Sequence, residues 1–577
     1  MPKIEVYEKP FYELIGRSFG EQELIDVLES AKGELDERLP SEGLLKIELN
    51  DTNRPDLWST AGLARELRSQ LTGESREYTF FSRPGEQRDA DERIVEVDPG
   101  LRDIRPYITA FVARGRRIDE PLLKDIIQSQ EKLCWNFGQR RRAIAMGVYR
   151  TEMMKFPVQY TAADPEETRF VPLEMSRSLS LREILTEHPK GVEFGFIVRD
   201  FDRFPYLTDA EGGTLSFPPV INSARIGAVE VGDDSVFIEL TGTDMDSLLL
   251  ATSITACDLS DMGFEILPVL VRYPYDTPYG REVVTPLYFQ STQSVDAAYA
   301  GRLLGEGIGA GEMADLLRRA GHTVSLEKDS LILTPPVFRN DFLHAVDVVE
   351  EVMIARGMES FEPEMPKEYT IGRFSEMEAF AREVNEVMVG LGYQEMIYNY
   401  LGSRKDFVER MNLSGEDFIE ISNPMTENYS MVRRSILPNL LASESVSSNA
   451  VYPHLIYETG KIAFKDPDRV YGSQTRTYLA FLHADREAGF NDVVSHVSAL
   501  FYYLAREHSL EEAEDPRFIP GRTARIVCRG ETVGVMGEMH PQVLENWGIQ
   551  MPCACAEIDL DALLDNPPRE GAPIHEE

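Results

Sequence analysis

Four carboxylates and a histidine lie within twelve residues in the stretch DFLHAVDVVEEV. A helix would place Asp347, Glu350 and Glu351 on one face, because residues three and four apart are neighbours there. Together with Asp341 in the preceding loop, they could converge on one hard cation such as Mg²⁺, which binds one or two carboxylates and keeps several waters. The alternative is that these acids are favoured at a helix N-terminus by the macrodipole.

A second group of polar residues lies on a predicted strand, VFIELTGTD, after the polar loop TLSFPPVINSARIG. Side chains two apart on a strand share a face, so Glu239 and Thr241 could line one pocket. A carboxylate beside a hydroxyl can position a hydrolytic water or bind an amine. The alternative is a strand that ends in an ordinary hydroxyl-stabilised turn.

Two arginine-rich runs are the third candidate. FGQRRRAIAMGVYR contains Arg140, Arg141 and Arg142 close to aromatic residues, and VARGRRID contains a second group. The aromatic residues are Trp135, Phe137 and Tyr149, and the second group is Arg114, Arg116 and Arg117. Arginine with aromatic side chains can hold a phosphate and stack a base. The alternative is a solvated positive face.

Several common catalytic patterns do not occur in the sequence. It contains no G-x-x-x-x-G-K-S/T loop, no H-E-x-x-H and no G-x-S-x-G. With only nine histidines, histidine-based metal or triad chemistry has few candidates.

Composition and charge narrow the class of protein. The 577 residues are 42% hydrophobic and carry a net charge of −39, which argues against wholesale electrostatic binding to nucleic acid or to an anionic membrane but leaves local basic patches open. The five cysteines form no C-x-x-C pair, the first residues contain no uncharged apolar segment, and no apolar run approaches the ~18 residues of a membrane span. We therefore expect a reduced, cytoplasmic protein.

The pattern of elements indicates an α+β multidomain chain with boundaries near residues 82–93, 276–284 and 361–370. In 94–275 we expect strands at ITAFVARG, FGFIVRD, SVFIELTG and FEILPVLVRY, and helices at EPLLKDIIQSQEKLCW and TDMDSLLLATSITACDLSDM. HTVSLEKDSLILTPP predicts a β-hairpin with its turn at EKDS. A helix and further strands from HLIYETGKIAF to CAEIDL follow. Because strands and helices do not alternate regularly, a parallel βαβ fold is disfavoured.

Five stretches, in this order, resemble the β subunit of phenylalanyl-tRNA synthetase of the archaeal and eukaryotic type. They are LNDTNRPDLWSTAGLARELR, LSFPPVINS with FIELTGTD, TPPVFRNDFLHAVDVVEEVMIARG, ISNPMTENYSMVRRSILPNLL and GEMHPQVLENWGI. They span the chain nearly end to end. The resemblance implies an N-terminal B1-like α+β domain (1–81), a B3/B4-like editing domain (94–275), a B5 winged-helix-like domain (285–360) and a class II synthetase-like antiparallel-sheet domain (371–577).

The resemblance also implies partners and cofactors. The family works as an α2β2 heterotetramer in which the α subunit uses ATP to charge tRNA(Phe) with phenylalanine. The β subunit contacts tRNA and hydrolyses wrongly attached tyrosine. Its members carry a Mg²⁺ site, shared with the α subunit, at a D-x5-D-x2-E-E pattern that falls here on Asp341, Asp347, Glu350 and Glu351.

By the same resemblance the editing pocket falls on Leu207, Ser216, Asn222, Glu239 and Thr241. Glu239 departs from the aspartate of archaeal relatives, since it keeps the charge but is one methylene longer. An apolar pocket cannot strongly exclude a substrate that adds a hydroxyl, so a second, hydrolytic site is the physical requirement for rejecting tyrosine.

The last domain resembles a class II catalytic domain without its catalytic residues. The strand HLIYETGKIA has Tyr457 before Glu458 and no arginine for the α-phosphate of ATP. Without such cations the charge on the phosphates would not be stabilised, so we expect this chain alone not to bind ATP. Two other functions stay open: a free-standing Tyr-tRNA deacylase, and a non-catalytic scaffold that binds RNA or protein.

Overall fold

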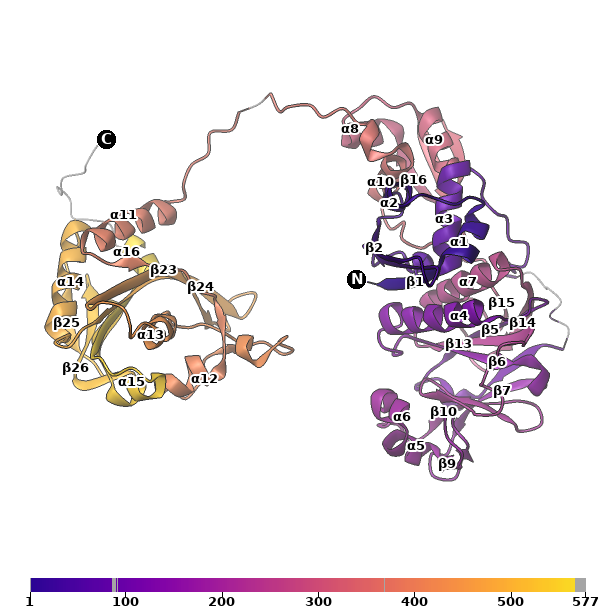
Figure 1. Ribbon diagram of the computed structural model, residues 1–577, viewed down its shortest axis with the longest axis horizontal. Coiled ribbons are helices and arrows are strands. Elements are labelled where there is room, and N and C mark those ends of the chain that lie inside the picture. Colours follow the sequence, from indigo (N-terminus) through magenta and orange to yellow (C-terminus); the bar gives the residue numbers. More distant parts are fainter. Residues whose placement is uncertain (1, 86–89, 91, 368, 566–577) are drawn as a thin grey trace. The chain divides into compact units, whose positions relative to one another are not determined.

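The computed structural model describes residues 2–85, 90, 92–367 and 369–565. The chain divides into two compact units, Met1–Glu364 and Met365–Glu577 (Figure 1). The architecture is mixed α/β and multidomain, as predicted. No helix in the described ranges combines the length and apolar character needed to cross a membrane.

The first unit begins with a small antiparallel sheet whose strand order is β1-β3-β2. Its strands are β1 (Lys3–Tyr7), β2 (Gly33–Leu39) and β3 (Leu44–Leu49), and its helices are α1 (Glu8–Ile15), α2 (Glu21–Glu29) and α3 (Thr60–Thr72). Helix α3 is well delimited by its sequence. The Ser59 side chain accepts a hydrogen bond from the Gly62 amide at its start, and Gly73 ends it at φ 70°.

A ten-stranded sheet follows, with the order β12-β11-β10-β7-β4-β14-β5-β13-β6 and β15 beside β14. The strands are β4 (Ile94–Val97), β5 (Tyr107–Arg114), β6 (Ile144–Arg150), β7 (Val158–Ala163), β10 (Phe204–Thr208), β11 (Thr214–Phe217), β12 (Ile221–Asn222), β13 (Ser235–Gly242), β14 (Glu265–Arg272) and β15 (Glu282–Thr285). Three of the four strands expected here are confirmed, as β5, β13 and β14.

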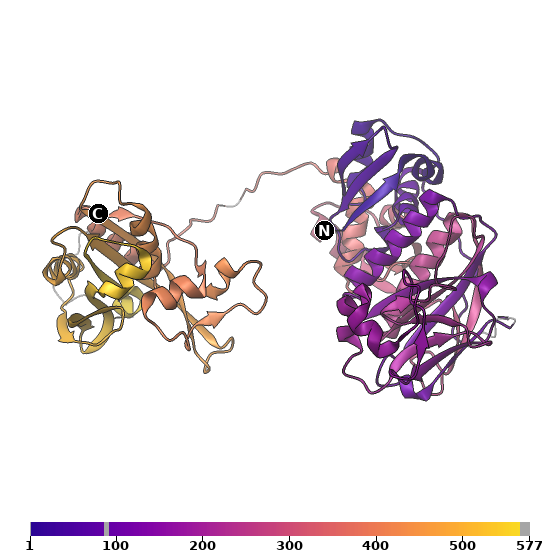
Figure 2. The same cartoon turned by 60° about the horizontal axis from the view of Figure 1, so that its bottom comes forward.

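Two predicted helices cover one face of this sheet. They are α4 (Glu120–Lys132), continued by a π-turn at Leu133–Phe137, and α7 (Met245–Asp261). Helix α7 is buried nearly all round because it lies between the sheet and α3 (Figures 1 and 2). Leu250 and Ile254 join the core of the first small sheet, whereas Leu248 and Ala251 join the core under β5, β6 and β13.

The predicted strand at FGFIVRD is wrong. The segment ends α6 (Pro189–Phe194), which follows α5 (Leu181–Glu187), and continues as a 3-10 turn at Gly195–Ile197. Phe194 and Val198 are both buried. Their spacing of four suits helical turns and not a strand, where alternate residues share a face.

The third sheet of this unit has the order β16-β18-β17, made of β16 (Gln293–Asp296), β17 (Thr323–Glu327) and β18 (Ser330–Thr334). The hairpin predicted at HTVSLEKDSLILTPP is confirmed as β17 and β18. The helices are α8 (Ala297–Leu304), α9 (Ala310–Arg319) and α10 (Ala345–Arg356). A two-stranded ladder elsewhere in the unit pairs β8 (Arg169–Phe170) with β9 (Leu179–Ser180).

The second unit is built on a seven-stranded sheet in the order β19-β23-β24-β28-β27-β26-β25. Its strands are β19 (Gln394–Glu395), β23 (His454–Lys465), β24 (Ser473–Ala484), β25 (Ser509–Glu512), β26 (Phe518–Cys528), β27 (Glu531–Met539) and β28 (Cys553–Asp559). A small sheet of β20 (Leu401–Gly402), β21 (Ile419–Glu420) and β22 (Met431–Val432) lies apart from it in the strand pairing.

Helices cover both faces of the seven-stranded sheet. Along β24, Leu479 and Phe481 belong to one core, with α11 (Glu376–Gly390), α14 (Phe490–Tyr503) and α16 (Leu560–Asp565). Ala480 and Leu482 belong to the other. This second core contains α13 (Leu437–Val446) and α15 (Pro541–Trp547), and the short helix α12 (Arg404–Phe407) precedes β21.

Candidate functional site

Glu239 and Thr241 lie on β13, an inner strand of the ten-stranded sheet between β5 and β6. Their side chains share one face, as the spacing predicted. Glu239 is 3% exposed and Thr241 is fully buried. Both are therefore positioned by a rigid element and not by a loop.

Leu207, Ser216 and Asn222 lie side by side on three adjacent strands. Leu207 of β10 is in register with Ser216 of β11, and Ser216 is in register with Asn222 of β12. These strands form the opposite end of the strand order from β13. Strand register brings the three together, although fifteen residues separate the first from the last.

Tyr149 connects the two groups of residues. Its hydroxyl lies 2.7 Å from Glu239 Oε1 and 2.8 Å from Ser216 Oγ. A phenol has one proton, so when Tyr149 donates to Glu239 the Ser216 hydroxyl donates to the phenol oxygen. The sequence showed Tyr149 only as an aromatic residue near the arginines, and no local signal pointed to this role.

Gly147 makes room for this contact. It faces Glu239 across the ladder between β6 and β13. A Cβ atom on Gly147 would lie 2.0 Å from the Tyr149 hydroxyl and 2.6 Å from Glu239 Oε1. Any larger residue would therefore displace the bonded pair.

The Glu239 carboxyl is only half satisfied. Tyr149 binds Oε1, whereas Oε2 is buried without a hydrogen-bond partner among the described residues. Burial raises the pKa of Glu239 to about 7, and the bond from Tyr149 and the charge of Arg105 oppose that rise. A carboxyl with this pKa can take up and release a proton near neutral pH.

Arg105 fixes the other half of the site, and sequence reasoning did not find it. It is 2% exposed, and its Nε donates to Thr241 Oγ1 over 2.9 Å. The same guanidinium donates to the Thr241 carbonyl and, over 2.9 Å, to the Arg142 carbonyl. Burial lowers the pKa of Arg105. Thr241 is thus tied to the arginine-rich turn by one side chain.

The arginine-rich turn, residues 139–142, has an unusual backbone. Gln139, Arg140 and Arg141 have φ values of 51°, 54° and 66°. A left-handed conformation costs a non-glycine residue about 1–2 kcal/mol, so three in a row must be held by their surroundings. The Arg140 and Arg141 amides donate to the carbonyls of Trp135 and Cys134, each over 2.9 Å.

The side chains of this turn lie on aromatic rings. Arg140 is 5.1 Å from the centre of the Trp135 ring, Arg141 is 4.0 Å from Phe194 and Arg142 is 4.9 Å from Phe196. Two of these rings come from the segment that was mistaken for a strand. Arg141 also donates to the Pro219 and Val220 carbonyls.

The second arginine group, Arg114, Arg116 and Arg117, differs from the arginine-rich turn because two of its members form ion pairs. Arg114 is 2.9 Å from Glu265, and Arg116 is 3.4 Å from Asp119. In the described part of the chain, no carboxylate lies within 4.0 Å of a guanidinium nitrogen of Arg140, Arg141 or Arg142.

The four acids of 341–351 do not gather around a common point. Arg339, at 3% exposure, forms two-pronged ion pairs with Asp341 and with Glu351. Glu351 also lies 3.1 Å from His322 Nε2, and Arg339 holds its pKa well below the usual range despite burial.

The other two acids turn elsewhere. Asp347 accepts the amides of Leu343 and His344 at the start of α10, and Glu350 pairs with Lys32 over 2.7 Å. Asp347 therefore serves the N-terminus of the helix, as the alternative interpretation predicted. In this chain by itself the four acids do not converge on one cation site. Asp341 and Glu351 share Arg339, whereas Asp347 and Glu350 have other partners. Across the residues that the structure places, no group of three or more His, Cys, Asp or Glu could hold a metal ion.

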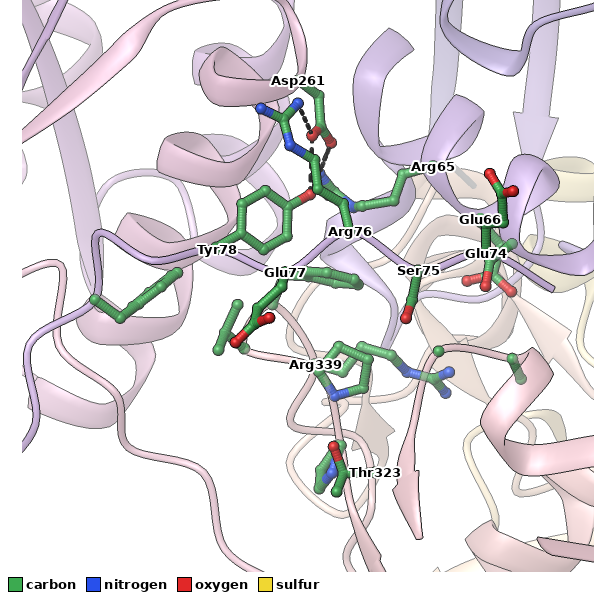
Figure 3. Close-up of a pocket in the computed structure, with 18 of the residues that line it drawn as sticks. Arg65, Glu66, Glu74, Ser75, Arg76, Glu77, Tyr78, Asp261, Thr323 and Arg339 are labelled. Atoms are coloured by element: carbon green, nitrogen blue, oxygen red, sulfur yellow. Dashed lines mark hydrogen bonds and ion pairs between the residues drawn. The ribbon is translucent and has the colours of Figure 1, made fainter. Parts of the chain in front are cut away.

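A large cleft of about 1690 Å³ lies where α3, the 74–83 segment and the 334–339 loop meet (Figure 3). Arginines line it, but their charges are met internally. Arg65 pairs with Asp258 and Asp261 and stacks on Phe338, and Arg76 pairs with Asp261. The cleft therefore does not offer a concentrated positive charge.

Glu458 of the second unit also has an arginine partner that the sequence did not reveal. Arg433 is fully buried, and it binds both carboxylate oxygens of Glu458 over 2.8 and 2.9 Å. Its remaining nitrogen donates to the Lys461 carbonyl over 2.9 Å. This guanidinium is committed to the protein itself.

Comparisons with known proteins agree with one another. A family model described as "Phenylalanyl tRNA synthetase beta chain CLM domain" matches residues 362–560, and one described as "tRNA synthetase B5 domain" matches residues 293–358. The phenylalanine–tRNA ligase beta subunit of Borrelia turicatae is 47% identical over 98% of this chain and 100% of its own length. That of Treponema pallidum is 45% identical over 98% of this chain and all of its own.

A solved structure extends the match to the fold. An N-terminal fragment of the phenylalanyl-tRNA synthetase beta subunit of Pyrococcus horikoshii superimposes with a TM-score of 0.57 at 36% identity. The match covers 62% of this chain and 99% of the fragment. Since relatives above 45% identity match almost end to end, the chain belongs to the phenylalanine–tRNA ligase beta subunit family.

Proposed function

We propose that this chain is the β subunit of a phenylalanine–tRNA ligase, a class II aminoacyl-tRNA synthetase, and that it supports charging of tRNA(Phe) by an α subunit and removes tyrosine from mischarged tRNA. The end-to-end similarity to beta subunits supports the first part. One observation carries the second part. Ser216, Tyr149 and Glu239 form a buried hydrogen-bonded chain, and one carboxylate oxygen of Glu239 has no partner in the part of the molecule that the structure describes.

In the proposed hydrolysis, Glu239 is the base for an attacking water. Oε2 accepts a proton from the water as its oxygen bonds to the ester carbonyl carbon. When the tetrahedral intermediate collapses, the bond to the tRNA 3′ oxygen breaks and that oxygen takes the proton back. The products are tyrosine and free tRNA.

The remaining residues orient this reaction. Tyr149 holds Oε1, so the carboxyl cannot rotate freely, and Arg105 holds Thr241. Leu207, Ser216 and Asn222 line the neighbouring strands, where they can contact the bound tyrosyl group. The extra methylene of Glu239 is accommodated because Gly147 opposite has no side chain.

Several finer features belong to the same proposal. We infer an α2β2 heterotetramer in the cytoplasm, a domain order of B1-like, B3/B4-like, B5-like and class II-like regions, and the archaeal and eukaryotic type of subunit. The 36% identity to the Pyrococcus horikoshii fragment favours this type, although the reported curated relatives are bacterial.

ATP is a substrate of the complete enzyme in this proposal and is not bound by this chain alone. An ATP phosphate would need a free arginine on β23, and that strand contains none. Arg433, which follows β22, is engaged with Glu458 of β23. The Mg²⁺ shared with the α subunit does not fit Asp341, Asp347, Glu350 and Glu351 as this chain arranges them in its described residues.

Co-purification with the α subunit tests the proposal. We expect equal amounts of the two chains, phenylalanine charging that needs both, and hydrolysis of Tyr-tRNA(Phe) by the complex. A lone chain that hydrolyses Tyr-tRNA would indicate a free-standing deacylase. A lone chain with neither activity would leave only a scaffold.

A further inference from the structure

The arginine-rich turn lies next to the candidate hydrolytic site and is fastened to it from two sides. Arg105 joins the turn to Thr241, because one guanidinium binds both Thr241 and the Arg142 carbonyl. Arg141 joins it to the 217–220 loop between Ser216 and Asn222 through two carbonyl bonds of 3.0 and 3.1 Å. The turn is therefore a rigid part of the site.

The three arginines of the turn therefore differ in what their side chains contact. Arg141 is half-buried, and its guanidinium is used by protein carbonyls. Arg140 and Arg142 are exposed, and each guanidinium lies over an aromatic ring without an ion-pair partner in the described ranges. Trp135, beneath Arg140, is 45% exposed.

Unpaired arginines are notable in a chain with a net charge of −39. Within the turn, Arg141 feels the charges of Glu193 and Glu131 without forming an ion pair with either. Arg114 and Arg116 show the usual outcome, in which a carboxylate neutralises a surface arginine. Two exposed guanidiniums and an indole ring offer what single-stranded RNA requires, namely phosphate contacts and a surface for base stacking.

We propose that Arg140, Arg142 and Trp135 form a docking ledge for the single-stranded 3′ end of tRNA and so deliver the aminoacyl ester to the Glu239 site. The inference rests on the proposed editing function. The ester sits on the terminal ribose, so the preceding phosphates must bind beside the hydrolytic residues. The ledge is joined to those residues by Arg105 and Arg141.

Steady-state hydrolysis of Tyr-tRNA(Phe) by the complex with the α subunit tests the ledge. We expect the double variant Arg140→Ala/Arg142→Ala to raise KM about ten-fold with little change in kcat. The slope of log(kcat/KM) against log salt concentration is negative, and it should become less steep by about 1.4, since each lost phosphate contact to a single strand removes about 0.7. The KM for tRNA(Phe) in phenylalanine charging should not change.

Two further variants separate the contributions. Trp135→Ala should raise KM several-fold and leave the salt slope unchanged, because it removes stacking and not charge. Arg114→Ala/Arg116→Ala is the matched control, with the same loss of formal charge from a paired group, and it should change neither quantity.

The outcomes distinguish the ledge from the editing function. A wild-type complex that does not hydrolyse Tyr-tRNA(Phe) would overturn the editing function and the ledge with it. A wild-type complex that hydrolyses it, with Arg140 and Arg142 variants that keep its KM and salt slope, would overturn the ledge alone. Equal effects of the control pair would also reject the ledge, since they would reflect general surface charge.

Discussion

Two buried glutamates, one in each unit of the chain, show how differently the same residue is used. Glu239 on β13 and Glu458 on β23 are each 3% exposed. Arg433 binds both oxygens of Glu458. Glu239 has Tyr149 on one oxygen and no partner for the other among the described residues.

In our proposal this difference separates a structural carboxylate, Glu458, from a reactive one, Glu239. A buried charge that is fully paired has no capacity left for a ligand, and removing its partner exposes the full penalty of burial. A buried oxygen without a protein partner calls for an explanation, and in our proposal the attacking water is bound there. The pKa of Glu239, raised to about 7 by burial, suits proton transfer.

The largest expected effect comes from breaking the paired site. Arg433→Met should destabilise the second unit by about 3–5 kcal/mol, because Glu458 would remain buried without a counter-charge. Urea unfolding, monitored by hydrogen exchange of the β23 and β24 amides, measures this loss of stability. Arg434→Ala is the neighbouring control, since Arg434 pairs with Asp417 at the surface and should change stability by under about 1 kcal/mol. If the two variants changed stability equally, the buried pair would be no more important for stability than the surface pair.

Breaking the half-paired site should act on chemistry instead. Glu239→Ala should slow Tyr-tRNA(Phe) hydrolysis at least about 100-fold, in the range of a lost general base. Phenylalanine charging by the complex should be unchanged, because it takes place on the α subunit in our proposal. Parallel assays of both reactions check this. An equal loss of charging and hydrolysis would assign Glu239 a structural role.

The sequence predicted the local elements well and the long-range contacts poorly. The strand β13 and the helices α4 and α7 were predicted from their own short stretches of sequence. FGFIVRD failed because a short apolar run carries no period that separates strand from helix. The loop acid Asp341 was placed correctly before α10, but its partner Arg339 was overlooked although it stands two residues away.

The candidate site shows the same limit more sharply. Glu239 and Thr241 share a face because of their spacing, which the sequence contains. Leu207, Ser216 and Asn222 came from the resemblance alone. Tyr149 and Arg105 escaped both, because their roles depend on strand order: β6 and β5 flank β13, and no local pattern encodes that pairing.

A smaller effect should come from Tyr149→Phe, which keeps the ring and removes the hydroxyl. The bond from Tyr149 lowers the pKa of Glu239. Because the ionised carboxylate is the base in our proposal, the rate of hydrolysis should rise as the pH passes through about 7. Losing the bond from Tyr149 raises the pKa of Glu239, so this rise in rate should move to higher pH. Rate profiles between pH 5 and 9 measure the shift.

Tyr273→Phe is the matched control for that profile. Tyr273 is buried in the same core, and its hydroxyl binds the Ile108 carbonyl and not a carboxylate. We expect its pH profile to coincide with that of the wild type. An unshifted profile for Tyr149→Phe would mean that the hydroxyl does not influence the titration of Glu239.

The smallest expected effect concerns Glu350, which is exposed whereas its neighbour Glu351 is buried. The Glu350 side chain is 48% exposed and pairs with Lys32 at the surface. Glu350→Ala should change the free energy of unfolding by less than about 1 kcal/mol. Glu351→Ala should cost more, about 1–3 kcal/mol, because the buried Arg339 loses one of its two carboxylate partners and keeps only Asp341. Urea unfolding measures both variants, and a large loss from Glu350→Ala would show that the acids of 341–351 act as one unit after all.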